Sequence, residues 1–114
     1  MTLAEIIETL DLELLTAAHD FSAVTITSGY ASDLLSRALA DAPHGGVWVT
    51  LQAHANVVAV AAVLELRAVI ITSGARPDAD TIAKANAEGV TLLATPQPTF
   101  AVVGRLWESG IRAG

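Results

Sequence analysis

The sequence predicts an α/β fold in which helices pack on a layered, mainly parallel β-sheet. From Gly46 onward, short apolar runs alternate with helix-length segments, a pattern typical of right-handed βαβ crossovers. The clearest run is 68–72, whose near-continuous apolar character is typical of a strand buried on both faces of a parallel sheet. No linker or low-complexity segment interrupts the 114 residues, so we expect a single domain over 1–114.

In the N-terminal half, the first helix has the most specific signal. Thr2 and Glu5 have the spacing of a capping box, in which each side chain accepts a hydrogen bond from the other residue's backbone N–H. This spacing predicts a helix over 3–9. The other elements expected in this half are a strand at 12–16, a polar connection at 17–22, a half-buried strand at 24–27, a turn at 28–32 and a helix at 33–40.

The C-terminal half is more regular. Its expected elements are a strand at 47–51, a helix at 56–66, a strand at 68–72, a helix at 78–88, a strand at 90–94 and a helix at 99–109. Gly89 is a favoured left-handed residue for ending the fourth of these. The helix at 56–66 is apolar nearly all round, which predicts burial on more than one side, in a core or in an interface.

One local pattern occurs twice. Each of the segments 24–29 and 69–74 is a strand-like run that ends in Thr-Ser-Gly, and an acid follows four residues after the glycine, Asp33 and Asp78 respectively. Capping explains both copies, since an aspartate near a helix start accepts hydrogen bonds from unpaired amides and glycine permits an unusual backbone angle. A shared ligand-binding role is the alternative.

Composition and charge exclude several classes of function. The chain has six Lys plus Arg against twelve Asp plus Glu, and therefore lacks the basic surface that a nucleic acid needs. Zero cysteines exclude a thiolate nucleophile and a Cys-ligated cluster or zinc, and the three histidines have no metal-ligand spacing, so we expect no metal and no cofactor. The longest apolar stretch, 57–64, is too short to span a membrane, and the acidic N-terminus is unlike a signal peptide, which predicts a cytoplasmic location.

Ligands in open parallel sheets gather beyond the carboxyl ends of the strands. The loops expected there supply hydroxyls, glycines, amides and one arginine, a set that suits a phosphate or a carboxylate. Asp33 and Asp78, at the same helix starts, oppose an anion. No nucleophile, acid or base forms a recognisable catalytic set, so we expect no catalytic residue. The candidate ligand-binding residues are Ser28, Gly29, Gln52, His54, Asn56, Thr72, Ser73, Gly74 and Arg76.

The excess of apolar residues predicts a partner. Hydrophobic residues make up 53% of the chain, charged residues 16%, and the mean hydropathy is +0.53, so we expect a homodimer. Tyr30 and Trp48 are candidate anchors because large aromatics are rare here, although core packing is the simpler interpretation of Trp48. The remaining interface candidates lie on the apolar helix: Val57, Val60 and Val63.

The segments 28–36, 47–61 and 70–74 together resemble the DRTGG domain family in its small stand-alone form, and the likeness covers nearly the whole chain. The Asp-Arg pair that names the family would fall near Ala53 and His54, so both charges are missing. The family's Thr-Gly-Gly corresponds to Thr72-Ser73-Gly74, with one glycine replaced. The resemblance implies an α/β layered fold. It also implies a dimerising or regulatory role, like that of the modules embedded in phosphotransacetylases and in pyrophosphatases with paired cystathionine-β-synthase-type domains.

Three functions follow as hypotheses. The first is a non-catalytic, homodimeric regulatory module that senses a small anionic metabolite or nucleotide. The second is a small phosphate-ester-binding enzyme that uses residues such as His54 and Ser73. The third is an accessory subunit that docks on a larger enzyme complex. Names such as serine kinase or hydrogenase-associated protein occur among stand-alone relatives, but this chain has neither a phosphate loop nor a thiol.

Overall fold

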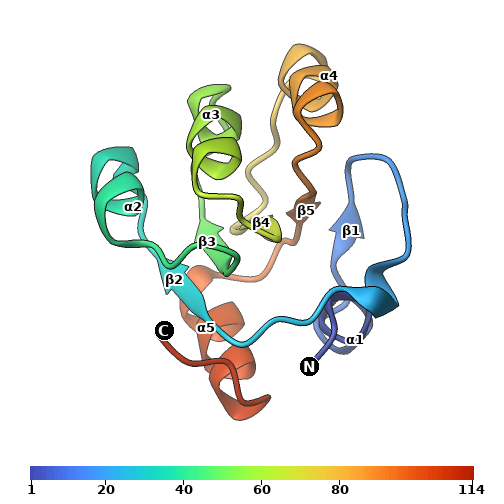
Figure 1. The fold of residues 1–114 in the computed structure, drawn as a ribbon, viewed down its shortest axis with the longest axis vertical. Helices are drawn as coiled ribbons and strands as arrows, with labels where there is room; N and C mark the ends of the chain where they lie inside the picture. Colours follow the sequence, from blue (N-terminus) through green and yellow to red (C-terminus); the bar gives the residue numbers. More distant parts are fainter.

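The computed structural model describes residues 1–114 and contains one five-stranded sheet (Figure 1). The strands lie in the order β1-β5-β4-β3-β2, and only β1 runs antiparallel to its neighbour. The predicted mainly parallel α/β architecture is therefore confirmed. The strands are β1 (Glu13–Leu14), β2 (Gly29–Ala31), β3 (Val47–Thr50), β4 (Ala68–Ile71) and β5 (Leu92–Ala94).

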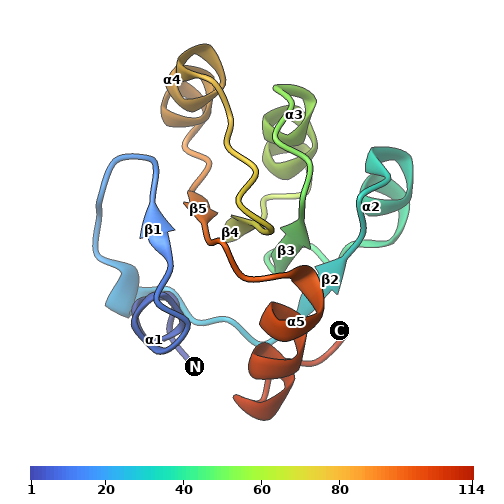
Figure 2. The same ribbon diagram turned by 180° about the vertical axis from the view of Figure 1, so that it is seen from behind.

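Helices cover both faces of the sheet (Figure 2). Those that connect the parallel strands, α2, α3 and α4, lie on one face, while α1 and α5 lie on the other. No helix is long and apolar enough to cross a membrane. The helices are α1 (Leu3–Thr9), α2 (Leu35–Asp41), α3 (Asn56–Val63), α4 (Ala79–Glu88) and α5 (Thr99–Glu108), with a short 3-10 helix, η1 (Phe21–Ala23).

The two faces of the sheet carry separate hydrophobic cores. Alternate residues of each strand point to opposite faces, so Val49 and Ile70 contribute to the core under α1 and α5, while Trp48 and Ile71 contribute to the core under α2, α3 and α4. All four residues of β3 and of β4 are buried. This confirms the interpretation of the run at 68–72 as a central strand.

The expected caps form at two helices. In α1, the backbone N–H of Glu5 donates to Thr2 Oγ1 at 3.2 Å, and the backbone N–H of Thr2 donates to Glu5 Oε1 at 2.9 Å. In α4, the carboxylate of Asp78 accepts from the backbone N–H of Thr81 at 2.8 Å, and Gly89 ends the helix with a φ of 71°. The same capping interpretation is wrong for Asp33, because α2 begins at Leu35 with no side-chain cap.

The prediction of a strand at 24–27 is wrong, and the turn predicted at 28–32 contains the edge strand β2. The reason is that the backbone of 24–26 hydrogen-bonds to the N-terminal residues instead of to β3. The backbone N–H of Leu3 donates to the carbonyl of Val24, and that of Ile26 donates to the carbonyl of Met1, both at 2.8 Å. The sheet therefore gains its last strand only where Gly29 comes opposite Val47.

In the C-terminal half, two boundaries differ from expectation by two residues or more. The helix predicted over 56–66 ends at Val63, because Glu65 adopts a left-handed backbone with a φ of 51° and turns the chain toward β4. The last strand begins at Leu92 rather than at residue 90. Neither change moves the carboxyl ends of β3, β4 and β5, which lie at one edge of the sheet.

Candidate functional site

The carboxyl edge of the sheet brings together most of the predicted ligand-binding residues. Gln52, His54 and Asn56 follow β3, and the segment from Thr72 to Arg76 follows β4. Ser28 and Gly29 do not join them. Because β2 starts at Gly29, opposite the first residue of β3, both lie at the amino edge, where Gly29 N–H donates to the carbonyl of Arg112.

Asp33 organises the loop after β3, a role that the sequence did not indicate. Its carboxylate accepts from Thr50 Oγ1 at 3.0 Å and from the backbone N–H of Leu51 at 2.8 Å. Gln52 Nε2 donates to the carbonyl of Asp33 at 3.0 Å. These bonds fasten the β2–α2 loop to the end of β3, and they engage the amide nitrogen of Gln52 within the protein.

The hydroxyls after β4 and β5 are also engaged with their neighbours. Thr72 Oγ1 lies 2.6 Å from Thr99 Oγ1, which joins β4 to the start of α5. The backbone N–H of Ser73 donates to the carbonyl of Gln97 at 2.8 Å. Ser73 and Gly74 are consecutive left-handed residues, with φ values of 59° and 75°, and this double turn directs Arg76 across the edge of the sheet. Gly74 suits the turn because it has no Cβ.

Arg76 meets an acidic residue 63 positions away in the sequence. Arg76 Nη2 lies 2.8 Å from Glu13 Oε2, and Nη1 lies 3.1 Å from Oε1, a two-bonded ion pair between the β4–α4 loop and the edge strand β1. The guanidinium lowers the pKa of Glu13, first through these hydrogen bonds and then through its charge, and Glu13 raises the pKa of Arg76 for the same reasons. Both side chains remain more than half exposed.

The ion pair lies beside an open hollow of about 460 Å³, which we call the Arg76 pocket. Its residues come from the start of β1 and the turn before it, from the β4–α4 loop, and from the end of β5 and the turn after it. They are Asp11, Leu12, Glu13, Gly74, Ala75, Arg76, Ala94, Thr95 and Pro96. Sequence reasoning found Arg76 and Gly74, but nothing in the spacing of the chain indicated Glu13. No group of three His, Cys, Asp or Glu side chains is arranged to hold a metal ion.

His54 makes a local bond within its own loop. Its Nδ1 accepts from the backbone N–H of Asn56 at 3.0 Å, at the start of α3. Asp78 lies close enough for the two to interact electrostatically. The pKa of Asp78 is lowered, mainly because its carboxylate accepts from the backbone N–H of Thr81, with smaller contributions from the Thr81 hydroxyl and from His54.

The lowered pKa of Asp78 predicts a stability term that depends on pH. Since the native-state pKa lies below the ordinary value of 3.8, the term is present above that value and is lost as the pH falls through the native-state pKa. Asp78→Asn keeps an N-cap acceptor but cannot titrate. We therefore expect its urea midpoint to fall less than that of the wild type between about pH 6 and about pH 3. Equal falls in the two proteins would contradict this role for Asp78.

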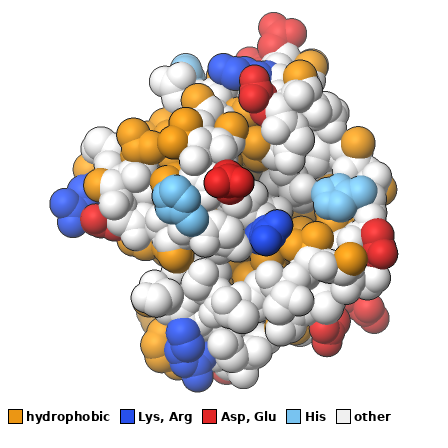
Figure 3. Space-filling view, viewed as in Figure 1, with side chains coloured by type: hydrophobic (Ala, Val, Ile, Leu, Met, Phe, Trp, Pro, Cys, Tyr) orange, Lys and Arg blue, Asp and Glu red, His pale blue; other side chains and the backbone are white.

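The predicted interface residues divide into buried and exposed groups. Trp48 and Val57 are buried within the chain, because β3 is central to the sheet and this face of α3 packs on it, so neither reaches the surface of a single copy. Tyr30 is half-buried and packs toward the core under α2, and Val60 is also half-buried. Val63 has 65% of its surface exposed. Figure 3 shows hydrophobic side chains gathered over α2 and α3.

Comparison with known proteins identifies the family. The model of the DRTGG domain matches residues 5–109. A solved structure of the CBS and DRTGG domains of the regulatory region of Clostridium perfringens pyrophosphatase, complexed with the activator diadenosine tetraphosphate, has a TM-score of 0.74 and 18% sequence identity. The alignment covers 90% of this chain but 44% of that one. No curated protein sequence matches. Since the family model spans nearly all of its residues, the chain belongs to the DRTGG domain family.

Proposed function

We propose that this chain is a non-catalytic regulatory module that forms a homodimer and receives a small anionic metabolite or nucleotide in the Arg76 pocket. The observation that carries the proposal is the exposed, two-bonded pair of Arg76 and Glu13 beside that pocket. The solved relative supports it, because its DRTGG domain belongs to the regulatory region of an enzyme and its complex contains a nucleotide activator. By the same analogy, the target of regulation is a larger enzyme to which the module docks.

In the proposed mechanism, a ligand phosphate replaces the Glu13 carboxylate on Arg76, and this exchange signals that the ligand is bound. The planar guanidinium donates two parallel hydrogen bonds to a phosphate in the same geometry as to a carboxylate. An exposed ion pair contributes little to stability, so a ligand phosphate can replace the Glu13 carboxylate at small cost. Glu13 lies on β1, the antiparallel edge strand. Its release would remove the ion pair that joins this strand to the β4–α4 loop. Ligand binding would thereby reach an outer edge of the sheet.

Thermal unfolding with a nucleoside polyphosphate tests this part of the proposal. A ligand at a hundred times its dissociation constant adds about 2.7 kcal/mol to stability, so the melting temperature is expected to rise. Arg76→Gln should abolish the rise, whereas Glu13→Gln should lower the ligand concentration needed, because it frees the guanidinium. Arg37→Gln, which alters an exposed arginine of α2, is the matched control and should respond like the wild type. A rise that survives Arg76→Gln would rule out this pocket.

The outward side of α3 is the proposed dimer surface. The helix contains no charged residue, and its inner side, with Val58 and Ala61, packs on the sheet. Val63 remains largely exposed on the outer side, and Leu39 of the neighbouring α2 has 47% of its surface exposed. A helix without charges whose outer side faces solvent is typical of a surface that another chain covers.

Sedimentation or light scattering tests the surface directly. At micromolar concentration we expect a mass twice the monomer value of 11.8 kDa. Val63→Glu places an unpaired charge in the proposed interface and is expected to yield monomers. Phe100→Glu is the control, because Phe100 is the most exposed large apolar side chain, at 88%, and lies on α5, across the sheet from α3. If Phe100→Glu yields monomers and Val63→Glu does not, the interface lies on the α5 face of the sheet, and the proposed α3 surface is wrong.

A further inference from the structure

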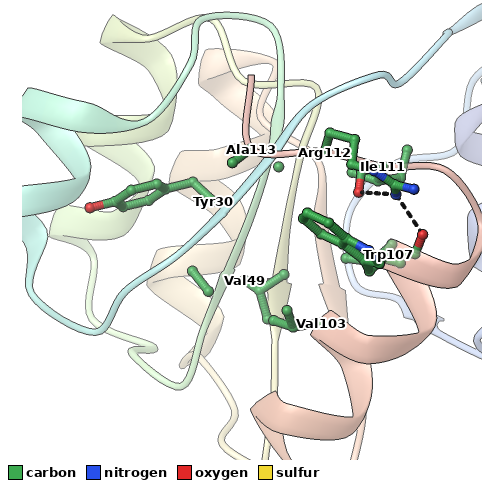
Figure 4. Close-up of a pocket in the computed structure, with 10 residues that line it drawn as sticks. Tyr30, Val49, Val103, Trp107, Ile111, Arg112 and Ala113 are labelled. Atoms are coloured by element: carbon green, nitrogen blue, oxygen red, sulfur yellow. Dashed lines mark hydrogen bonds between the residues drawn. The ribbon is translucent and has the colours of Figure 1, made fainter.

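A second, apolar pocket lies between α5 and β2, on the face of the sheet opposite α3 (Figure 4). Val49 of β3 and the backbone of β2 form its floor, and Val103, Leu106 and Trp107 of α5 form one wall. The C-terminal segment 111–113 closes the other side. The volume is about 180 Å³, and eight of the ten lining residues are hydrophobic. We call this the α5–β2 pocket.

Small side chains on β2 leave this space open. Gly29 and Ala31 are the residues of β2 that share a face with Val49, since side chains alternate along a strand. A Cβ on Gly29 would lie 3.1 Å from Ile111 Cγ2 and 3.3 Å from Val47 Cγ1, so glycine lets the C-terminal segment approach closely. Ala31 remains exposed and brings only a methyl group to the lining.

Arg112 is the charged residue of the lining. Its guanidinium carbon lies 4.2 Å from the centre of the Trp107 ring, and Nη1 donates to the carbonyls of Trp107 at 2.7 Å and Ile111 at 3.2 Å. Nε and Nη2 donate to no protein atom, and no carboxylate pairs with this arginine. The stacking therefore holds a guanidinium with free donors against Trp107, a side chain that itself lines the pocket.

We propose that the α5–β2 pocket binds a small amphipathic carboxylic acid, with its hydrocarbon part against Val49, Val103 and Trp107 and its carboxylate on Arg112. Size and charge both support this ligand class. A closed apolar cavity of about 150 Å³ accepts benzene, so 180 Å³ suits a body of about six carbons. The free donors of Arg112 match a carboxylate. The site is distinct from the Arg76 pocket, so its failure would leave the proposed regulatory function untouched.

The two tryptophans provide a direct test by NMR. Trp107 lines the pocket and has 54% of its surface exposed, whereas Trp48 is fully buried and its Nε1 donates to the carbonyl of Ser32. Titration with hexanoate or benzoate, up to about 10 mM, is expected to shift the indole N–H signal of Trp107 saturably and leave that of Trp48 in place, with a Kd of about 0.1–1 mM. Whichever acid binds more tightly identifies the body as aliphatic or aromatic.

Variants separate the charge from the cavity. Arg112→Gln is expected to weaken hexanoate binding at least about tenfold while leaving the weak binding of hexanol unchanged. Ala31→Leu fills the pocket and should abolish the binding of both, with a thermal melt to confirm folding, and Arg37→Gln is the control for loss of an arginine. An unmoved Trp107 signal, or hexanoate binding that is unaffected by Arg112→Gln, would overturn the proposal. A Trp107 shift caused by protein concentration alone would also overturn it, since a second copy would then occupy the pocket.

Discussion

Trp48→Ala is expected to lower the free energy of unfolding by about 3–5 kcal/mol. Trp48 is the largest fully buried side chain and lies in the core under α2, α3 and α4. Its Nε1 also donates to the carbonyl of Ser32 at 3.0 Å, which joins β3 to the residue that follows β2. The substitution therefore opens a cavity and removes a hydrogen bond. The midpoint of urea unfolding, measured at a fixed protein concentration, gives the loss.

Trp107→Ala is the matched control for this prediction. It removes the same side chain from a partly exposed position on α5, so we expect a cost of about 1 kcal/mol or less. Because a small domain has a total stability of about 5–15 kcal/mol, only Trp48→Ala threatens the folded state. A loss for Trp48→Ala as small as that expected for Trp107→Ala would mean that Trp48 is not an interior side chain of the isolated domain.

Gly46→Ala is expected to destabilise the protein by about 1–3 kcal/mol. A Cβ at this position would lie 2.9 Å from both the carbonyl oxygen and Oγ of Ser28, and 3.2 Å from the carbonyl oxygen of Pro43. The carbonyl of Ser28 also accepts from the backbone N–H of Val47 at 3.0 Å, so it cannot move away without loosening the start of the β2–β3 pair. Urea unfolding again provides the measurement.

Gly104→Ala should have the opposite effect and raise the free energy of unfolding. Gly104 lies inside α5, and a Cβ there would meet nothing within 4 Å apart from its chain neighbours and the backbone of its own helix. Alanine loses less conformational freedom than glycine in a helix, so we expect stability to rise by about 0.5–1 kcal/mol. If Gly46→Ala were also neutral or stabilising, the close contact between Gly46 and Ser28 would not constrain the fold.

The elements that the sequence predicted best are those whose signals lie within a few residues. The capping residues of α1 and α4 are adjacent in sequence to the amides that they bind, and Gly89 is next to the helix that it ends. The sequence did not predict the edge strand β2, because its position depends on whether the segment before it pairs with the N-terminal residues or with β3. The segment 24–26 has good strand character, but it hydrogen-bonds to the N-terminal residues 1–3 instead of to β3.

The same distinction applies to the candidate site. The rule that ligands gather at the carboxyl ends of parallel strands placed Gln52, Ser73 and Arg76 at one edge, as the structure does. It gave no indication of Glu13, which reaches that edge because β1 turns antiparallel beside β5. The role of Asp33 was also hidden, because its carboxylate binds the end of β3 instead of its own helix.

By itself, the sequence determined the fold class, the helix caps and the resemblance to the DRTGG domain, because capping bonds and apolar periodicity act over one or two turns of chain. Only the tertiary structure decided which charges meet and which apolar side chains stay exposed. Arg76 pairs with Glu13, and Trp48 is buried while Trp107 is not, through contacts between segments far apart in the chain. Such contacts depend on the order and direction of the strands, which the local pattern of residues does not encode.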